Sequence, residues 1–204
     1  MNDIESYIFG LLVTDGSLYL SKKGSKGKVT LEVNNKDSDI IYKLYNIIPN
    51  SSVRQRIRNT NFKNNYKTEI FSNSRKEFRE FLILNGFPIF KKSENVGPPN
   101  STYDEIHFWR GIIDGDGSIG ITSKNIPFIS FVTISENLKN SYVKFIEKTL
   151  NRKIKTTRNK RDNAYNIMIS RKDAIILAKI LYIDNNNGLY LERKYKKALD
   201  LQKL

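Results

Sequence analysis

Two copies of one short pattern, 101 positions apart (116 − 15), constrain the fold of this chain more than any other feature. The first copy is IFGLLVTDGS at residues 8–17, and the second is WRGIIDGDGS at residues 109–118. Each is an apolar run with an internal glycine, which predicts a helix that ends at an Asp-Gly step, because glycine tolerates positive φ. A repeated helix that ends in a carboxylate predicts a paired acidic site on a pseudo-two-fold axis.

The same order of elements is expected after each copy, since alternating apolar residues indicate strands and 3.6-residue periodicity indicates helices. In the first half we expect hairpins from residues 17–23 with 28–34 and 53–58 with 66–71, and helices at 37–48 and, capped by Ser74, at 75–84. In the second half we expect hairpins from residues 118–122 with 128–134 and 153–158 with 165–170, and helices at 136–150, 171–180 and 189–203. The strand at 128–134 is apolar on both faces, so we expect it to be covered on both sides or shifted in register.

These elements predict an α+β fold of two αββαββα units, each with a saddle-like antiparallel sheet. We expect the units to span residues 1–87 and 102–204 and to be joined by a proline-containing linker at 88–101.

The net charge of +14 is shared between the halves, with +6 over residues 1–100 (16 basic, 10 acidic) and +8 over residues 101–204 (19 basic, 11 acidic). Even sharing favours one extended polyanion, such as nucleic acid, that contacts both halves. The alternative is a basic chain whose charge only maintains solubility.

The chain has no cysteine, no apolar run of membrane-spanning length and no basic signal-peptide region at its start. We therefore expect a soluble, intracellular protein without a membrane partner. Four alanines beside abundant Asn, Lys and Ile are typical of an A/T-rich genome. This composition suggests the cytoplasm of a bacterium or phage host, or an organelle matrix.

Gly10 and Gly111 would let the two motif helices cross closely, which would bring Asp15 and Asp116 together. Two carboxylates about 4 Å apart repel by roughly 4 kcal/mol at an effective dielectric constant of 20, so a cation is expected between them. Hard oxygen ligands favour Mg²⁺, which retains water and binds phosphates. The pattern predicts metal-assisted phosphodiester hydrolysis, although a single Asp-Gly after a helix is also common as a simple turn.

Both motifs, followed by hairpins and a basic surplus, resemble the LAGLIDADG homing endonucleases of the single-chain, two-motif type. The second copy is the closer match, with Asp114 as well as Asp116, whereas the first departs from the family pattern at Val13 and Thr14. The resemblance covers nearly the whole chain. It implies a monomer that cleaves both strands of a long, pseudo-palindromic DNA target with two or three Mg²⁺ ions, for which Mn²⁺ substitutes.

The resemblance also implies roles for particular residues. Asp15 and Asp116 would bind the metal ions, helped by the carbonyl groups of Thr14 and Gly115. A basic residue would lie near each scissile phosphate, and a polar residue after the second strand of each half would hold the water network. The matching basic positions are Lys92 and Lys194, and the matching polar positions, counted from the motifs, are Asn35 and Glu136.

The polar strand faces would lie along the DNA major groove. The first-half candidates for DNA contact are Tyr19, Ser21, Lys23, Lys28, Thr30, Glu32, Arg54, Arg56 and Arg58. The second-half candidates are Ser123, Lys124, Lys153, Lys155, Arg158 and Asn166. Alternatively, the three arginines form a solvated outer face.

Three functions remain open at this point. The first is a site-specific double-strand DNA endonuclease, which retention of both acidic positions favours. The second is an intron RNA maturase, a role that some members of the resembled family have. The third is a non-catalytic DNA-binding regulator. An intein is disfavoured, because the sequence has neither a nucleophile at its start nor an asparagine at its end.

Overall fold

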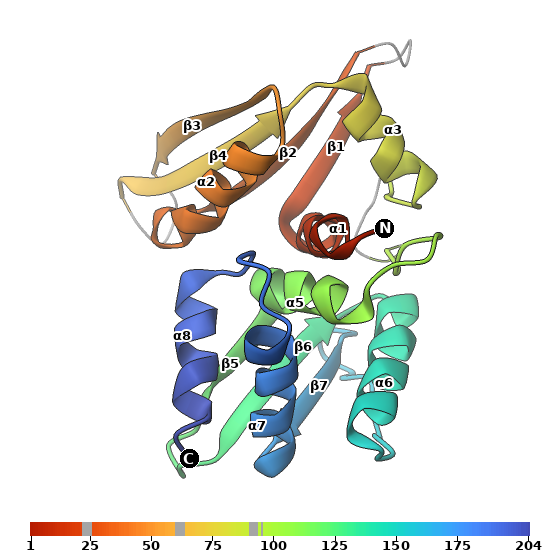
Figure 1. The fold of residues 1–204 in the computed structure, drawn as a ribbon, viewed down its shortest axis with the longest axis vertical. Coiled ribbons are helices and arrows are strands. Elements are labelled where there is room, and N and C mark those ends of the chain that lie inside the picture. Colours follow the sequence, from red (N-terminus) through yellow and green to blue (C-terminus); the bar gives the residue numbers. More distant parts are fainter. Residues whose placement is uncertain (22–25, 60–63, 90–93, 95) are drawn as a thin grey trace.

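The structure is a computed structural model that describes residues 1–21, 26–59, 64–89, 94 and 96–204. Lys23 and Lys92, both predicted site residues, lie outside the described residues. The chain forms an α+β fold with two antiparallel sheets, as the sequence predicted. Figure 1 shows one sheet on each side of a central pair of helices, α1 and α5.

The first part of the chain follows the predicted order. Its elements are α1 (Asp3–Asp15), β1 (Gly16–Leu20), β2 (Gly27–Asn34), the 3-10 turn η1 (Asn35–Asp37), α2 (Ser38–Ile47), β3 (Ser51–Arg58), β4 (Tyr66–Asn73) and α3 (Lys76–Leu84). The sheet has the order β1-β2-β4-β3. In the row Gly16–Leu31–Phe71–Val53, Leu31 and Phe71 are fully buried under the helices. The next row, Ser17–Thr30–Ser72–Ser52, points to the opposite face.

The second part has one strand fewer than predicted. Its elements are α5 (Glu105–Asp116), β5 (Gly117–Ile121), β6 (Pro127–Thr133), α6 (Glu136–Leu150), β7 (Tyr165–Ser170), α7 (Lys172–Ala178), the π-helical η2 (Lys179–Asp184) and α8 (Glu192–Leu201). The sheet has the order β5-β6-β7. No helix among the described residues is both long and apolar enough to cross a membrane.

The predicted strand at residues 153–158 is wrong. Only Arg158 makes a bridge to β7, through Tyr165. The segment has a single large apolar side chain to bury, Ile154, and the Glu147 carboxylate holds it against α6 instead. That carboxylate accepts the Ile154 N–H at 2.9 Å and lies 3.2 Å from the Lys153 Nζ. The outer edge of β7 is consequently not covered by a regular fourth strand.

Two smaller predictions also need correction. The β6 strand is not covered on both sides, because Val132 is 47% exposed while Ile129 and Phe131 on the other face are buried. Ser74 is not the cap of α3, since Arg75 occupies that position and no side chain caps the helix there. The exposed apolar side chains of β6 belong to the open face of the second sheet.

Helices α1 and α5 pack backbone to backbone where they cross. A Cβ atom added to Gly10 would lie 2.3 Å from the Phe108 carbonyl oxygen, and one added to Gly111 would lie 2.3 Å from the Tyr7 carbonyl oxygen. No side chain fits at either position, so these two glycines set the distance between the helices. The core continues outward from this crossing, with Trp109 packed against Tyr142 and Phe145 of α6.

Candidate functional site

The two motif carboxylates are the last residues of the crossed helices. Asp15 ends α1 and Asp116 ends α5, and both residues are exposed. Strands β1 and β5 start at the following glycines, Gly16 and Gly117. The expected positive φ is absent, because both glycines are extended, with φ of −78° and −81°. They are required for space instead, since a Cβ would lie 2.6 Å from the Leu12 carbonyl oxygen or 2.7 Å from that of Ile113.

The helix crossing also brings Thr14 and Gly115 together. A Cβ atom on Gly115 would lie 1.8 Å from the Thr14 Oγ1, which itself donates to the Leu11 carbonyl at 2.7 Å. Thr14 and Asp116 both line a small cavity of about 180 Å³ whose far wall includes Thr133. Residues from the two repeats, far apart in sequence, therefore share one site.

Lys194 lies beneath this site rather than at the surface. Its side chain is buried, and its Nζ donates to the carbonyl oxygens of Ile113 (2.5 Å), Asp114 (2.6 Å), Gly115 (3.2 Å) and Gly117 (2.8 Å). Burial lowers the Lys194 pKa to about 8. The cation thus satisfies the carbonyls left open at the C-terminal end of α5, where a positive charge is favourable.

The expected contact of Lys194 with a scissile phosphate is not supported by this position. The α8 helix begins at Glu192, and its first turn directs Lys194 toward the end of α5 instead of toward solvent. Lys194 does lie close enough to Asp15 for the carboxylate to favour its charged form. It shares the Gly115 carbonyl, a predicted metal ligand, through its weakest hydrogen bond.

Asp114 is a buried residue that the site prediction omitted. Its carboxylate accepts hydrogen bonds from the Tyr7 hydroxyl (2.8 Å), the Tyr182 hydroxyl (2.8 Å) and the Leu191 backbone N–H (2.9 Å). Burial raises the pKa of Asp114 and of both tyrosines, and the tyrosine pKa values are raised further by the Asp114 charge. Asp114 therefore joins α1, α5, η2 and the start of α8 behind the exposed carboxylates.

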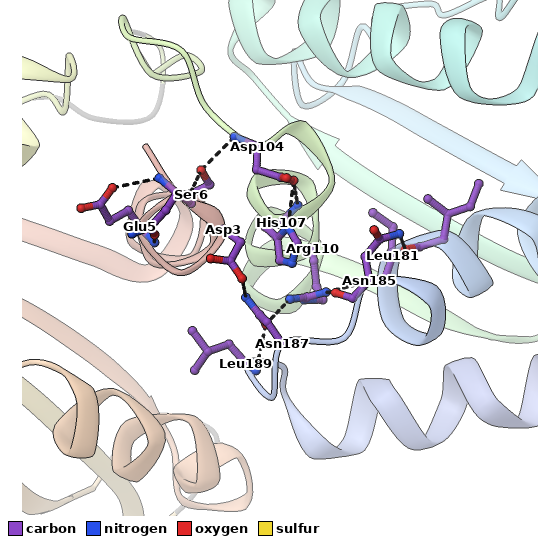
Figure 2. Close-up of polar contacts among 12 residues, drawn as sticks. Asp3, Glu5, Ser6, Asp104, His107, Arg110, Leu181, Asn185, Asn187 and Leu189 are labelled. Carbon is purple, nitrogen blue, oxygen red and sulfur yellow. Dashed lines mark hydrogen bonds and ion pairs between the residues drawn. The ribbon is translucent and has the colours of Figure 1, made fainter.

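A second buried network, centred on Arg110, joins the same elements at the other end of the helix pair (Figure 2). The Arg110 guanidinium donates to the carbonyls of Leu181 (2.9 Å) and Asn185 (2.6 Å) and to the Asn187 side chain. The Asn187 amide donates in turn to Asp3 of α1 at 3.2 Å. Asp104, which caps α5 through the His107 N–H, accepts with its carboxylate and donates its own N–H to Ser6 of α1 at 3.0 Å.

Asn35 and Glu136, predicted to hold waters, are not equivalent in the structure. Gly16 pairs with Leu31 and Gly117 with Phe131, so the second strands are offset by 100 positions (131 − 31). Asn35 therefore corresponds to Ser135, because the second hairpin turn is one residue shorter. Ser135 is buried and caps α6, whereas Glu136 is exposed and its carboxylate lies 3.9 Å from the Lys139 Nζ. Asn35 is exposed at the end of β2 and accepts from Gln55 at 3.5 Å.

Most of the predicted DNA-contacting residues of the first half share the open face of the first sheet. Glu32 is the centre of this face, where it accepts from Thr68 at 2.7 Å and pairs with Arg56 (3.4 Å) and Arg58 (3.6 Å). Arg54 lies on the same face, paired with Ile70 across the strands. The other described members of this face are Tyr19, Lys28 and Thr30, while Ser21 directly follows β1.

In the second half only Asn166 lies on the open sheet face, opposite Val132. Ser123 and Lys124 lie in the exposed turn between β5 and β6. Lys153, Lys155 and Arg158 lie in the irregular segment before β7, where the Arg158 side chain donates to the Asn163 carbonyl at 3.0 Å. The positive charge of this half therefore surrounds the sheet face and does not lie on it.

No group of three or more His, Cys, Asp or Glu side chains within the described ranges is arranged to hold a metal ion. The helix ends nevertheless suit Mg²⁺, which is commonly bound through one or two carboxylates with the rest of its shell from water and substrate phosphate. Asp15 and Asp116 would supply those carboxylates, and the adjacent main-chain carbonyls would supply neutral oxygen donors.

Comparisons with known proteins agree with this geometry. Residues 104–182 match the family model of the LAGLIDADG-like domain. No curated protein matches the sequence. The structure of the I-WcaI homing endonuclease bound to its DNA recognition sequence superimposes with a TM-score of 0.66 at 15% identity, over 96% of this chain and 85% of that one. A structure from the homing endonuclease I-DmoI gives 0.63 at 14% identity, over 99% and 98%.

This chain has the fold of a single-chain LAGLIDADG homing endonuclease. In LAGLIDADG terms, α1 and α5 are the two motif helices and the two sheets are the paired saddles. I-DmoI has also been solved with its target DNA in the presence of Mg and of Mn, at TM-scores of 0.58 and 0.57 and identities of 13% and 15%. At these identities the likeness concerns the fold, so function is argued from the residues of this chain.

Proposed function

We propose that this protein is a site-specific endonuclease that cuts both strands of a DNA target with divalent metal ions. The observation that carries the proposal is the pair of exposed carboxylates, Asp15 and Asp116, at the ends of two helices held together by Gly10 and Gly111. Each carboxylate directly precedes the first strand of a sheet. A duplex lying across both sheets would place its two backbones over this pair. The DNA-bound relatives support this placement.

Bound Mg²⁺ would polarise the scissile phosphate and activate water for attack. Asp15 and Asp116 would hold the ions, with the carbonyls of Thr14 and Gly115 as further oxygen donors. Lys194 would act as a positioning residue, since its ammonium orients the carbonyls at the end of α5. Asn35, at the end of β2, would orient water near Asp15.

Basic residues of both halves would bind the DNA backbone, and the open sheet faces would contact the base edges. We also propose residues 1–87 and 102–204 as the two half-site units, acting together as a monomer. Retention of both acidic positions favours cleavage over a purely regulatory role.

Cleavage selection from a plasmid library with a randomised insert of about two helical turns tests the proposal. In Mg²⁺ we expect linearised plasmids that share one sequence, and in EDTA we expect none. Light scattering of the complex with the selected duplex should show one chain per duplex. Absence of any linear product in Mg²⁺ or Mn²⁺ would contradict the proposal, and two chains per duplex would contradict the monomeric arrangement.

A further inference from the structure

The two open sheet faces differ in chemistry. The face of the first sheet carries Lys28, Glu32, Arg54, Arg56 and Arg58. The face of the second sheet, for which every strand residue is described, carries no charged side chain. Its members are Ser118, Gly120, Phe128, Ser130, Val132, Asn166, Met168 and Ser170. The two halves therefore cannot recognise equivalent DNA sequences by equivalent contacts.

Apolar side chains on this uncharged face are open to solvent. Met168 is 58% exposed and Val132 is 47% exposed, although each lies on a central or paired strand. Met168 and Phe128 line a cavity of about 470 Å³ together with Ser170 and the basic residues Arg152 and Arg171. The cavity thus has an apolar floor, and cations stand at its edge.

The surrounding charge favours DNA as the occupant of this face. Lys124 lies in the turn at one end of the sheet, and Arg158 bridges to Tyr165 at the edge of β7. An uncharged strip between basic margins matches a major groove, where base edges lie between two phosphate backbones. A second copy of this chain would bring +14 of like charge onto the same margins.

We infer that the second sheet selects an A·T-rich half-site through the methyl groups of thymine, with Met168 and Val132 as the specificity-determining residues. Thymine C5-methyl is the apolar group of the major groove, and apolar side chains contact it. A G·C pair would instead leave its groove donors and acceptors unpaired against this face, which is unfavourable. Asn166 adds the hydrogen-bonding pattern that suits adenine. This inference rests on the proposed function.

Binding selection from a randomised duplex library in EDTA, followed by uracil-for-thymine replacement in one half-site at a time, tests the inference. Uracil lacks only the methyl group. We expect one A·T-rich half-site, in which each removed methyl weakens binding by about fourfold, the value for one buried carbon group. In the other half-site, assigned by its sensitivity to Arg54→Ala, the same replacement should change affinity by less than about twofold.

Variants connect the effect to particular side chains. Met168→Ser and Val132→Thr should each remove the uracil effect at their own positions while thermal unfolding is unchanged, because both side chains are largely exposed. Leu84→Ser, an exposed apolar change at the end of α3, is the matched control and should leave the uracil effect intact. A uracil effect that is equal in both half-sites, or that persists in both variants, would overturn the inference alone. Failure to enrich any sequence would overturn the proposed function together with it.

Discussion

The Lys194 Nζ lies 2.6 Å from the carbonyl oxygen of Asp114, and three further carbonyls at the end of α5 complete its hydrogen-bonding shell. A buried lysine held only by carbonyls orders the backbone that leads from Asp114 to the exposed Asp116. Stability at this point and metal binding at the next residues are therefore coupled through one side chain.

The Lys194 pKa of about 8, lowered by burial, predicts a pH-dependent contribution to stability. Because the folded pKa lies below the unfolded value of about 10.4, the unfolded state holds more protons between these limits, and this contribution rises with pH. In metal-free buffer, the free energy of unfolding of the wild type minus that of Lys194→Met should increase by roughly 2 kcal/mol from pH 7 to 9.5. Urea unfolding measures the difference. Lys196→Met, an exposed neighbour on α8, should show no such pH trend.

Gly10→Ala and Gly111→Ala should each destabilise the fold by about 1–3 kcal/mol or more, because a methyl group would overlap backbone across the helix crossing. Gly120→Ala is the control, since its nearest neighbour is the Phe128 ring at 3.4 Å. Thermal unfolding of the three variants should separate the first two from the third. Equal melting temperatures in all three would mean that the helices are not in backbone contact.

Tyr7→Phe and Tyr182→Phe should each cost about 1.5–3 kcal/mol, because each removes a hydroxyl donor from the buried Asp114 carboxylate. The double variant should depart from additivity, since both hydroxyls bind one group. Tyr45→Phe, at an exposed position, serves as the control in urea unfolding. Strict additivity with small single effects would remove Asp114 as the centre of this network.

Arg54→Ala should weaken DNA binding without lowering thermal stability, because its side chain lies on the open face of an edge strand. If Arg54 contacts a phosphate, the slope of log K against log salt should fall by about 1. If it contacts a base, the loss should be about 1–3 kcal/mol at one position. Lys67→Ala, on the opposite face, is the control. An unchanged affinity and slope for Arg54→Ala would place this face away from DNA.

The parts of the fold that follow local periodicity could be predicted from the sequence. The two motif helices, the first sheet and α6 lie where apolar spacing places them. The strand at 153–158 could not be excluded in advance, because its competitor is a single long-range contact, that of Glu147 with Ile154. The position of Glu136 was misjudged because the hairpin turns differ by one residue, which the motif spacing does not reveal.

The site is less accessible to sequence reasoning than the fold. Lys194 was singled out as a basic residue near the motif, yet its burial depends on how α8 packs beneath α5. Asp114 was recognised as part of the second motif but not as a buried centre, since its two tyrosine donors lie 107 and 68 positions away. The Gly-Asp-Gly step that contains it was the available signal.

Cleavage of the selected DNA target by Asp15→Asn and Asp116→Asn tests the central claim most directly. Both side chains are exposed at helix ends, so the isosteric changes should leave folding and DNA binding intact. We expect double-strand cleavage in Mg²⁺ to be abolished in each variant, while affinity measured in EDTA stays within about twofold of the wild type. Full double-strand cleavage by either variant would contradict the account.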